Sequence, residues 1–578
     1  MFWLAFLTAS LAAQTSIFPS DPLSSFRLTC TAGGAMVRVP VDGQPFLEAL
    51  RITTPGTIST GTDREWSCRI RHTLAVSLKQ NDWLVAVFHV RSLEAGPEGA
   101  AAKLSFERNS PDYRKSVSAG NLVTSTWRRV QVPFRVVEDY RPGEAMIDFW
   151  VGYDPQVIEI GGLQIDNHGP SPAPPVPTLG FTYIGREADA PWRAEAAARI
   201  DEHRKSSLVV RVVDAAGKPV PEAGVQVRMQ RHAFGFGTAV TAAGLLGTTR
   251  DDEIYRARFL ELFNKAVLEN DLKWPGWQAN PQRALDALAW LRARDIPARG
   301  HNMVWPNWQY LPADLRTLAT DAGALRARID QHILDVGSRT RGQVVDWDVV
   351  NEPIPNRVLQ EVLGDDELVR WFQLARSVDP DVRLFINEYD IETGGGLNRR
   401  KQDQFYALIE DLLAKGAPVT GIGIQGHFGS NVTTPPRVYE ILDRFARLNL
   451  PIQITEFDIT TLDEQLQADY TRDYLTICFS HPALNSFLMW GFWEGRHWRP
   501  EAALFRRDWS EKPNAGAWRD LIYREWWTNA DGVTSEEGAF EVRGFLGDYE
   551  VTVEAGGRQF QQNYRLEKDS APLVFTLP

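Results

Sequence analysis

The sequence predicts an α/β fold, a (β/α)8 TIM barrel that follows a jelly-roll-like β-sandwich. Residues 24–168 hold short strand-like runs separated by turns, without a helical period, which is typical of an all-β sandwich. From about Phe234 onward, eight apolar strand-like segments alternate with segments whose apolar residues recur at helical spacing. Eight such alternations over about 290 residues match the usual size of a closed (β/α)8 barrel.

The first residues, "MFWLAFLTASLAAQTS", resemble a secretory signal. An apolar run is followed by small residues near Ala12 and Ala13, although no Lys or Arg precedes it. We therefore expect residues 1–13 to be a signal peptide and the protein to be secreted, periplasmic or at the cell surface. No later apolar run is long enough to span a bilayer.

Cysteine usage indicates neither a metal centre nor a disulfide framework, because the chain has three cysteines and no zinc-ligand spacing. In an oxidising compartment Cys30 and Cys68 could form one disulfide. Cys478 lies in "YLTICFSHP", which we expect to pack as a helix. The sequence predicts no metal and no other cofactor.

The N-terminal sandwich is predicted over residues 14–168, with strand-like runs such as "WLVAVFHVRSL" and "AMIDFWVGYD". A Pro-rich linker over residues 169–181 follows it. Residues 182–232 then open with the Ala-rich helical segment "PWRAEAAARIDEHRK" and end in two strand-like runs. Four Trp of the sandwich are candidates for its core or for ligand contacts: Trp66, Trp83, Trp127 and Trp150.

The barrel is predicted over residues 233–527. Its strands are "FGFGTAV", "KAVLEND", "ARGHNMVW", "VVDWDVVNE", "VRLFINEYD", "GIGIQGHF", "PIQITEFDI" and "SFLMWGFWE". An open doubly wound sheet is the alternative, but no Gly-rich phosphate loop follows the first strand.

Seven of these strands end in polar or aromatic side chains, and in such a barrel the carboxyl ends of the strands form the active face. Core packing does not explain so many polar ends on one rim. In strand order they are Glu269, Asn270 and Lys273; His301 and Trp305; Asn351 and Glu352; Glu388 and Tyr389; Gln425 and His427; Glu456 and Asp458; and Trp490, with Trp498 just beyond.

Two of these residues, Glu352 and Glu456, form the pair that glycoside hydrolysis needs, in which one acid protonates the leaving oxygen while the other attacks or activates water. His427 could hydrogen-bond the attacking carboxylate, and Asp458 could orient that imidazole. Asn351, beside the acid, could hold the sugar 2-hydroxyl.

The aromatic residues and the net charge both favour a carbohydrate ligand. Trp305, Trp490 and Trp498 are individually ambiguous between core and ligand stacking, but around two acids we expect them to wall a groove. A net charge of −12 argues against a nucleic-acid partner. We expect a polysaccharide as the partner and a monomer in solution.

The motifs resemble those of glycoside hydrolase family 10, the retaining endo-1,4-β-xylanases. The similarity extends from about Phe234 to Trp526 through "ENDLKW", "RGHNMVW", "WDVVNE", "GIGIQGH", "ITEFDI" and "WGFWEGRHW", in the family's order. The resemblance implies that Glu352 is the acid/base and Glu456 the nucleophile, and that xylan is the substrate. It also implies sugar contacts by Glu269, Asn270, Lys273, His301, Gln425 and Trp490.

Two segments depart from the family pattern. Pro306 in "WPNWQYLP" replaces a family His, and the family Gln is either displaced to Gln309 or lost. The loop "WEGRHWRPEAALFRRDW" also differs from its usual form. Both changes lie at the expected subsite walls, so they leave open which xylan decoration and chain length are preferred.

The segments on either side of the barrel, "LVVRVVDAAGKPVPEAGVQVRM" and "ADGVTSEEGAFEVRGFLGDYEVTVEAGG", together resemble the small β-sandwich of carboxypeptidase regulatory-like domains. We infer one sandwich split around the barrel, with residues 528–578 as its second part. The alternative is two separate small β-structures, one on each side of the barrel. The N-terminal sandwich resembles xylanase carbohydrate-binding modules only in general style.

The sequence therefore favours a secreted endo-β-1,4-xylanase with a carbohydrate-binding-like module. The alternatives are a hydrolase of another β-glycan, such as glucan or mannan, and a non-catalytic polysaccharide-binding protein. The presence of both carboxylates with their supporting residues favours an enzyme.

Overall fold

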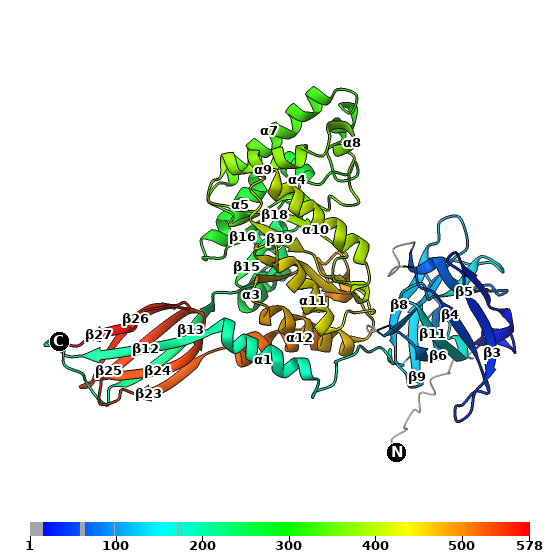
Figure 1. The fold of residues 1–578 in the computed structure, drawn as a ribbon, viewed down its shortest axis with the longest axis horizontal. Coiled ribbons are helices and arrows are strands. Elements are labelled where there is room, and N and C mark those ends of the chain that lie inside the picture. The colour runs from blue at the N-terminus through cyan, green and yellow to red at the C-terminus, as the bar shows by residue number, and fades with distance from the viewer. Residues whose placement is uncertain (1–14, 58–63, 97–98, 171–172, 175) are drawn as a thin grey trace, which may run out of the picture.

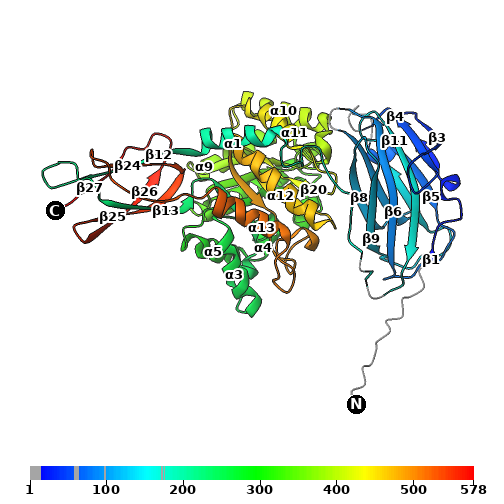
Figure 2. The same cartoon turned by 90° about the horizontal axis from the view of Figure 1, so that it is seen from below.

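Three bodies lie in a row in the computed structural model, which describes residues 15–57, 64–96, 99–170, 173–174 and 176–578 (Figure 1). The barrel lies between the N-terminal β-sandwich and a smaller β-sandwich, and a view from below shows the same order (Figure 2). The predicted signal peptide lies outside the described residues. Within these ranges, no helix combines the length and apolarity needed to cross a membrane.

The N-terminal sandwich, here called the module, consists of two antiparallel sheets with the strand orders β3-β4-β11-β6-β9 and β2-β5-β10-β7-β8, and β1 pairs with β11. Buried and less buried residues alternate along much of β6, as expected for a strand with one face on the core. The strands are β1 (Thr15–Ser16), β2 (Arg27–Cys30), β3 (Ala35–Pro40), β4 (Glu48–Thr54), β5 (Cys68–Thr73), β6 (Trp83–Glu94), β7 (Ala100–Arg108), β8 (Lys115–Val123), β9 (Arg128–Arg135), β10 (Ala145–Trp150) and β11 (Gln156–Asn167).

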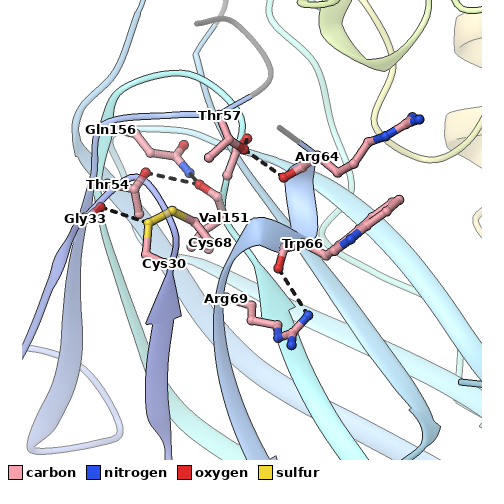
Figure 3. The surroundings of a disulfide bond; sticks show 11 residues. Cys30, Gly33, Thr54, Thr57, Arg64, Trp66, Cys68, Arg69, Val151 and Gln156 are labelled. Carbon is pink, nitrogen blue, oxygen red and sulfur yellow. Dashed lines mark hydrogen bonds between the residues drawn. A yellow bond between two sulfur atoms is a disulfide. The ribbon is translucent and has the colours of Figure 1, made fainter. Parts of the chain in front are cut away.

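A disulfide joins Cys30 at the end of β2 to Cys68 at the start of β5 (Figure 3). It anchors the short 3-10 turn η2 (Glu65–Ser67), which directly precedes Cys68. Cys478 is buried in the helix α12 (Glu464–Ser480).

The smaller sandwich combines strands from both sides of the barrel. One sheet has the order β24-β12-β27 and the other β23-β13-β25-β26. Leu208 pairs with Val542, and Val227 pairs with Val551, across more than three hundred residues of intervening chain. The strands are β12 (Lys205–Val213), β13 (Gly224–His232), β23 (Asn529–Val533), β24 (Ala539–Phe545), β25 (Gly547–Ala555), β26 (Arg558–Leu566) and β27 (Leu573–Thr576).

Eight parallel strands close the barrel, because β14 pairs with both β15 and β22. This closure confirms the predicted fold class and excludes the open sheet. A short additional strand, β20 (His427–Phe428), pairs with β21. The barrel strands are β14 (Gly235–Val240), β15 (Lys265–Leu268), β16 (Ala298–Val304), β17 (Asp346–Asn351), β18 (Arg383–Glu388), β19 (Gly421–Ile424), β21 (Ile452–Ile459) and β22 (Leu484–Met489).

The helices that surround the barrel begin at local signals in the sequence. The Thr249 hydroxyl and the Asp252 carboxylate form a capping box at the start of α3, and Pro435 opens α11. The helices are α1 (Pro191–Arg204), α2 (Ala242–Leu246), α3 (Arg250–Leu262), α4 (Trp274–Ala279), α5 (Pro281–Arg292), α6 (Ala313–Thr317), α7 (Ala322–Thr340), α8 (Gln360–Leu363), α9 (Glu367–Val378), α10 (Arg399–Ala414), α11 (Pro435–Ala446), α12 (Glu464–Ser480) and α13 (Pro513–Asp520).

The two sandwiches contact opposite ends of the barrel. The Arg231 guanidinium in the smaller sandwich donates to the carbonyls of Asn264 and Asp295, which lie just before the strands β15 and β16 begin. The module instead contacts loops that follow strands, because its residues Ala101 and Tyr153 form a buried cluster with Leu397. The active face predicted from the sequence is therefore the face toward the module.

Candidate active site

The two predicted carboxylates occupy the carboxyl ends of β17 and β21. Glu352 directly follows β17, and Glu456 lies within β21 with 4% of its surface exposed. Glu352 has a φ of 53°, in the left-handed region that a residue with a Cβ rarely adopts. Strain of this kind persists where the surrounding structure fixes it, which is common at functional sites.

Three amide side chains link the two carboxylates. The Gln425 amide donates to Glu352 Oε1 at 3.0 Å and approaches Asn351 Oδ1 at 3.5 Å. Asn387 Nδ2 donates to Glu456 Oε1 at 2.7 Å and to Asn351 Oδ1 at 2.9 Å. The Asn351 Nδ2 is buried and has no hydrogen-bond partner among the described residues, so it can serve a bound hydroxyl.

His427 lies between Glu456 and Asp458 and supports the second carboxylate oxygen of Glu456. His427 Nε2 lies 3.3 Å from Glu456 Oε2, and its Nδ1 lies 3.0 Å from Asp458 Oδ2. Trp498 Nε1 donates to the same Asp458 oxygen at 2.7 Å. Burial lowers the pKa of His427, but the two carboxylates outweigh it and raise the pKa to about 10. The imidazole is therefore cationic at neutral pH.

The pKa values of the two carboxyls shift in opposite directions. Burial raises the pKa of Glu352, which the negative charge of Glu456 raises further against the Gln425 hydrogen bond. Burial also acts to raise the pKa of Glu456, but His301, His427 and Lys273 lower it to about 2. The pKa of one carboxyl is thus raised, as suits a proton donor, and the other carboxyl is held ionised, which separates an acid from a nucleophile.

The predicted sugar-contact residues of the second and third strands lie beside Glu456. His301 Nδ1 is 2.9 Å from Asp348 Oδ2 and 3.9 Å from Glu456 Oε1. Lys273 Nζ donates to Asn270 Oδ1 at 3.0 Å. The charges of Lys273 and Glu456 both affect the pKa of Glu269, which burial raises.

The aromatic residues differ in how much surface they offer a ligand. Trp305 stacks on Tyr310 with ring centroids 3.6 Å apart, and its Nε1 donates to Glu352 Oε2 at 3.2 Å. Trp490 is 5% exposed and meets the His301 ring edge-on at 5.0 Å. Trp498 is 48% exposed.

The fifth strand places Tyr389 at the rim above a buried ion pair. Lys401 Nζ lies 2.9 Å from Glu388 Oε1 and 3.2 Å from the centroid of the Tyr389 ring. Glu388 Oε2 also accepts from the Ile354 backbone N–H at 3.0 Å, so it holds the loop that carries Glu352.

Sequence reasoning missed Asn387 and Asn356, which donate to Glu456 and Glu352 respectively. Asn387 is an inward-facing position of β18 and was accessible from the two-residue period of a strand. Asn356 lies in an irregular loop, where no periodic signal exists. Gln309 is exposed, and its role as the displaced family Gln stays a prediction.

Within the described ranges, no group of His, Cys, Asp and Glu side chains is arranged to hold a metal ion.

Comparisons with known proteins match residues 226–520 to the family described as glycosyl hydrolase family 10. Anti-sigma-I factor RsgI6 of Acetivibrio thermocellus is 34% identical over 70% of this chain and 51% of its own length. Endo-1,4-beta-xylanase 1 of Arabidopsis thaliana is 31% identical over 65% of this chain and 39% of its own length. The chain thus spans about half or less of these relatives. The crystal structure of xylanase 10B from Thermotoga petrophila with xylobiose is 26% identical, with a TM-score of 0.47, over 51% of this chain and 95% of that one.

Proposed function

We propose that this chain, which belongs to glycosyl hydrolase family 10, hydrolyses internal β-1,4-xylosidic bonds of xylan by a retaining double displacement. The observation that carries the proposal is the pair of carboxyls with opposite pKa shifts, linked by amides on one barrel rim. The relatives whose names state a xylanase activity support xylan as the substrate.

In the first step, ionised Glu456 attacks the anomeric carbon while protonated Glu352 gives its proton to the leaving oxygen. Asn387 and His427 hold one Glu456 oxygen each, so the carboxylate is fixed before the substrate arrives. In the second step, Glu352, now ionised, takes a proton from water, and that water releases the sugar from Glu456.

The N-terminal residues support a secreted enzyme, because their apolar run and small residues are typical of a signal peptide. The disulfide between Cys30 and Cys68 fits an oxidising compartment. Asn351, Glu269, Asn270 and Lys273 present donors and acceptors suited to the equatorial hydroxyls of xylose.

Reducing-sugar release from xylan, arabinoxylan, mannan and β-glucan tests the substrate assignment. We expect release from the two xylans and much lower kcat/KM on cello-oligosaccharides than on xylo-oligosaccharides. Equal kcat/KM on both series would reject the xylanase assignment while leaving a hydrolase. Absence of release from all four polymers would favour a binding protein instead.

A further inference from the structure

We infer that the N-terminal module forms an outer wall of the substrate cleft, in which Trp66 stacks on a sugar unit of the bound polysaccharide beyond Tyr389. The inference rests on the proposed function and adds a subsite contributed by another domain.

The module contacts the loops that follow β18 and β20, on the active face. Leu397 in the first loop is buried against Ala101 and Tyr153 of the module. In the second loop, the Asn431 side chain approaches Gly120 of β8 so closely that a Cβ at Gly120 would lie 2.7 Å from that of Asn431. Glycine at position 120 is therefore needed for this close approach.

The end of the module that meets the barrel also carries Trp66. Trp150 pairs with Lys103 and Arg69 across neighbouring strands, and Lys103 pairs with Gly120, so these residues share one end of the sheet. Trp66 packs edge-on against Trp150 with ring centroids 5.5 Å apart. Trp66 is 40% exposed, whereas Trp150 is buried.

The η2 turn holds Trp66 in a fixed position. The Gly152 N–H donates to the Glu65 carbonyl at 3.0 Å, and the Thr31 N–H donates to the Ser67 carbonyl at 3.0 Å. The disulfide of Cys68, which directly follows the turn, ties the end of η2 to Cys30 (Figure 3). In Figure 3 the side chains of Arg64 and Trp66 project to the same side, away from the disulfide. A platform fixed in this way costs little entropy on binding.

Charged residues at this turn act on residues of the catalytic rim. The Tyr389 hydroxyl lies within range of the charges of both Glu352 and Arg64, and the Asp390 carboxyl lies within range of Glu65. Tyr389 thus interacts electrostatically with both the acid/base and the module.

The order of strands around the barrel shows which half of the substrate would reach the module. Glu352 follows β17 and Glu456 lies on β21, and these two strands divide the rim into two arcs. Lys273, His301 and Trp490 lie on the larger arc. Tyr389 lies on the smaller arc, with the module. On the larger arc, His301 Nδ1 lies 3.9 Å from Glu456 Oε1, and Lys273 Nζ lies 5.8 Å from the centroid of the Trp490 ring, so we place the sugar that Glu456 attacks among these residues. The leaving half of the polysaccharide then extends over Tyr389 toward Trp66.

The positions of the cuts in long xylo-oligosaccharides test this subsite. Hydrolysis in water enriched in oxygen-18, read by mass spectrometry, gives the share of cleavage at each bond. This share does not depend on how much enzyme is folded. A subsite on the leaving side favours cuts far from the reducing end. We expect Trp66→Ala to move the cuts toward the reducing end and to lower kcat/KM on xylan by about three- to tenfold.

Two further variants complete the test. Gly120→Ala should move the cuts in the same direction, because its Cβ pushes the module away from Asn431. Tyr113→Ala is the matched control, since Tyr113 is 43% exposed in the loop after β7, at the opposite end of the same sheet. An aryl xylobioside should be hydrolysed equally by all four proteins. If Trp66→Ala left the cut positions unchanged, the inference would be overturned while the hydrolase remained. If the wild type cut no xylo-oligosaccharide, the proposed function itself would fail.

Discussion

Replacing Asn387 by Ala should weaken catalysis without removing either carboxyl. Asn387 is fully buried, and its Nδ2 donates to Glu456 Oε1 at 2.7 Å and to Asn351 Oδ1 at 2.9 Å. A hydrogen bond to a charged group stabilises by about 1.5–3 kcal/mol, which corresponds to roughly 10- to 150-fold in kcat/KM if the transition state depends on it. A carboxylate that moves by about 1 Å costs a similar factor.

The same variant should change the pH profile. Loss of about 1.5–3 kcal/mol raises the pKa of Glu456 by roughly one to two units from its value of about 2. Glu456 would stay ionised near neutral pH, so the loss of kcat/KM at neutral pH remains. The acid limb of the profile of kcat/KM against pH moves to higher pH.

Kinetics on an aryl xylobioside from acidic to neutral pH, together with urea unfolding, measure both effects. Asn514→Ala is the control, because Asn514 is also fully buried and its Nδ2 donates to the Ala503 carbonyl, away from the carboxylates. The control should lose stability and keep its kcat/KM. A kcat/KM for Asn387→Ala within about twofold of the wild type, with an unmoved acid limb, would refute the reasoning.

Two further predictions concern stability. Burial raises the pKa of Glu392 from its ordinary value of 4.5 to about 7, so the folded state favours its neutral form and loses up to about 3 kcal/mol of stability as the pH rises from about 4.5 to about 7. The free energy of unfolding, measured with urea at acidic and at mildly alkaline pH, should fall less with pH in Glu392→Gln than in the wild type. An equal fall in both proteins would contradict the predicted direction. Deleting residues 530–578 should expose Leu208 and Val227 and lower the melting temperature although the barrel is complete, and an unchanged melting temperature would indicate independent decorations.

The barrel could be predicted from the sequence because its strands are buried on both faces. Such strands are apolar runs, and the polar residues at their carboxyl ends then stand out, as Glu352 does after "VVDWDVVN". The structure confirms the eight strands and brings Glu352, Glu456, Gln425 and His427 together.

The contacts between domains could not be predicted, because they depend on three-dimensional placement. Nothing in the sequence around Trp66 or Gly120 indicates that these residues face the barrel. The amide link through Asn387 could be predicted only in part. Glu388 and Tyr389, which directly follow Asn387, mark the polar strand end, but the sequence does not show which carboxylate Asn387 contacts. A single sequence also gives no pKa. The pKa values of Glu352 and Glu456 differ mainly because of the cations around Glu456, which only the structure places.

The most direct test of the two carboxyl roles is the product that each alanine variant forms with azide on an aryl xylobioside. Glu352→Ala should show a burst and then a slow steady rate, because a good leaving group needs little protonation but deglycosylation lacks its base. Azide needs no base, so it should accelerate the second step and yield the β-glycosyl azide. Glu456→Ala should show no burst, and azide should give at most the α product. The β product from Glu456→Ala with the α product from Glu352→Ala would reverse the two assignments.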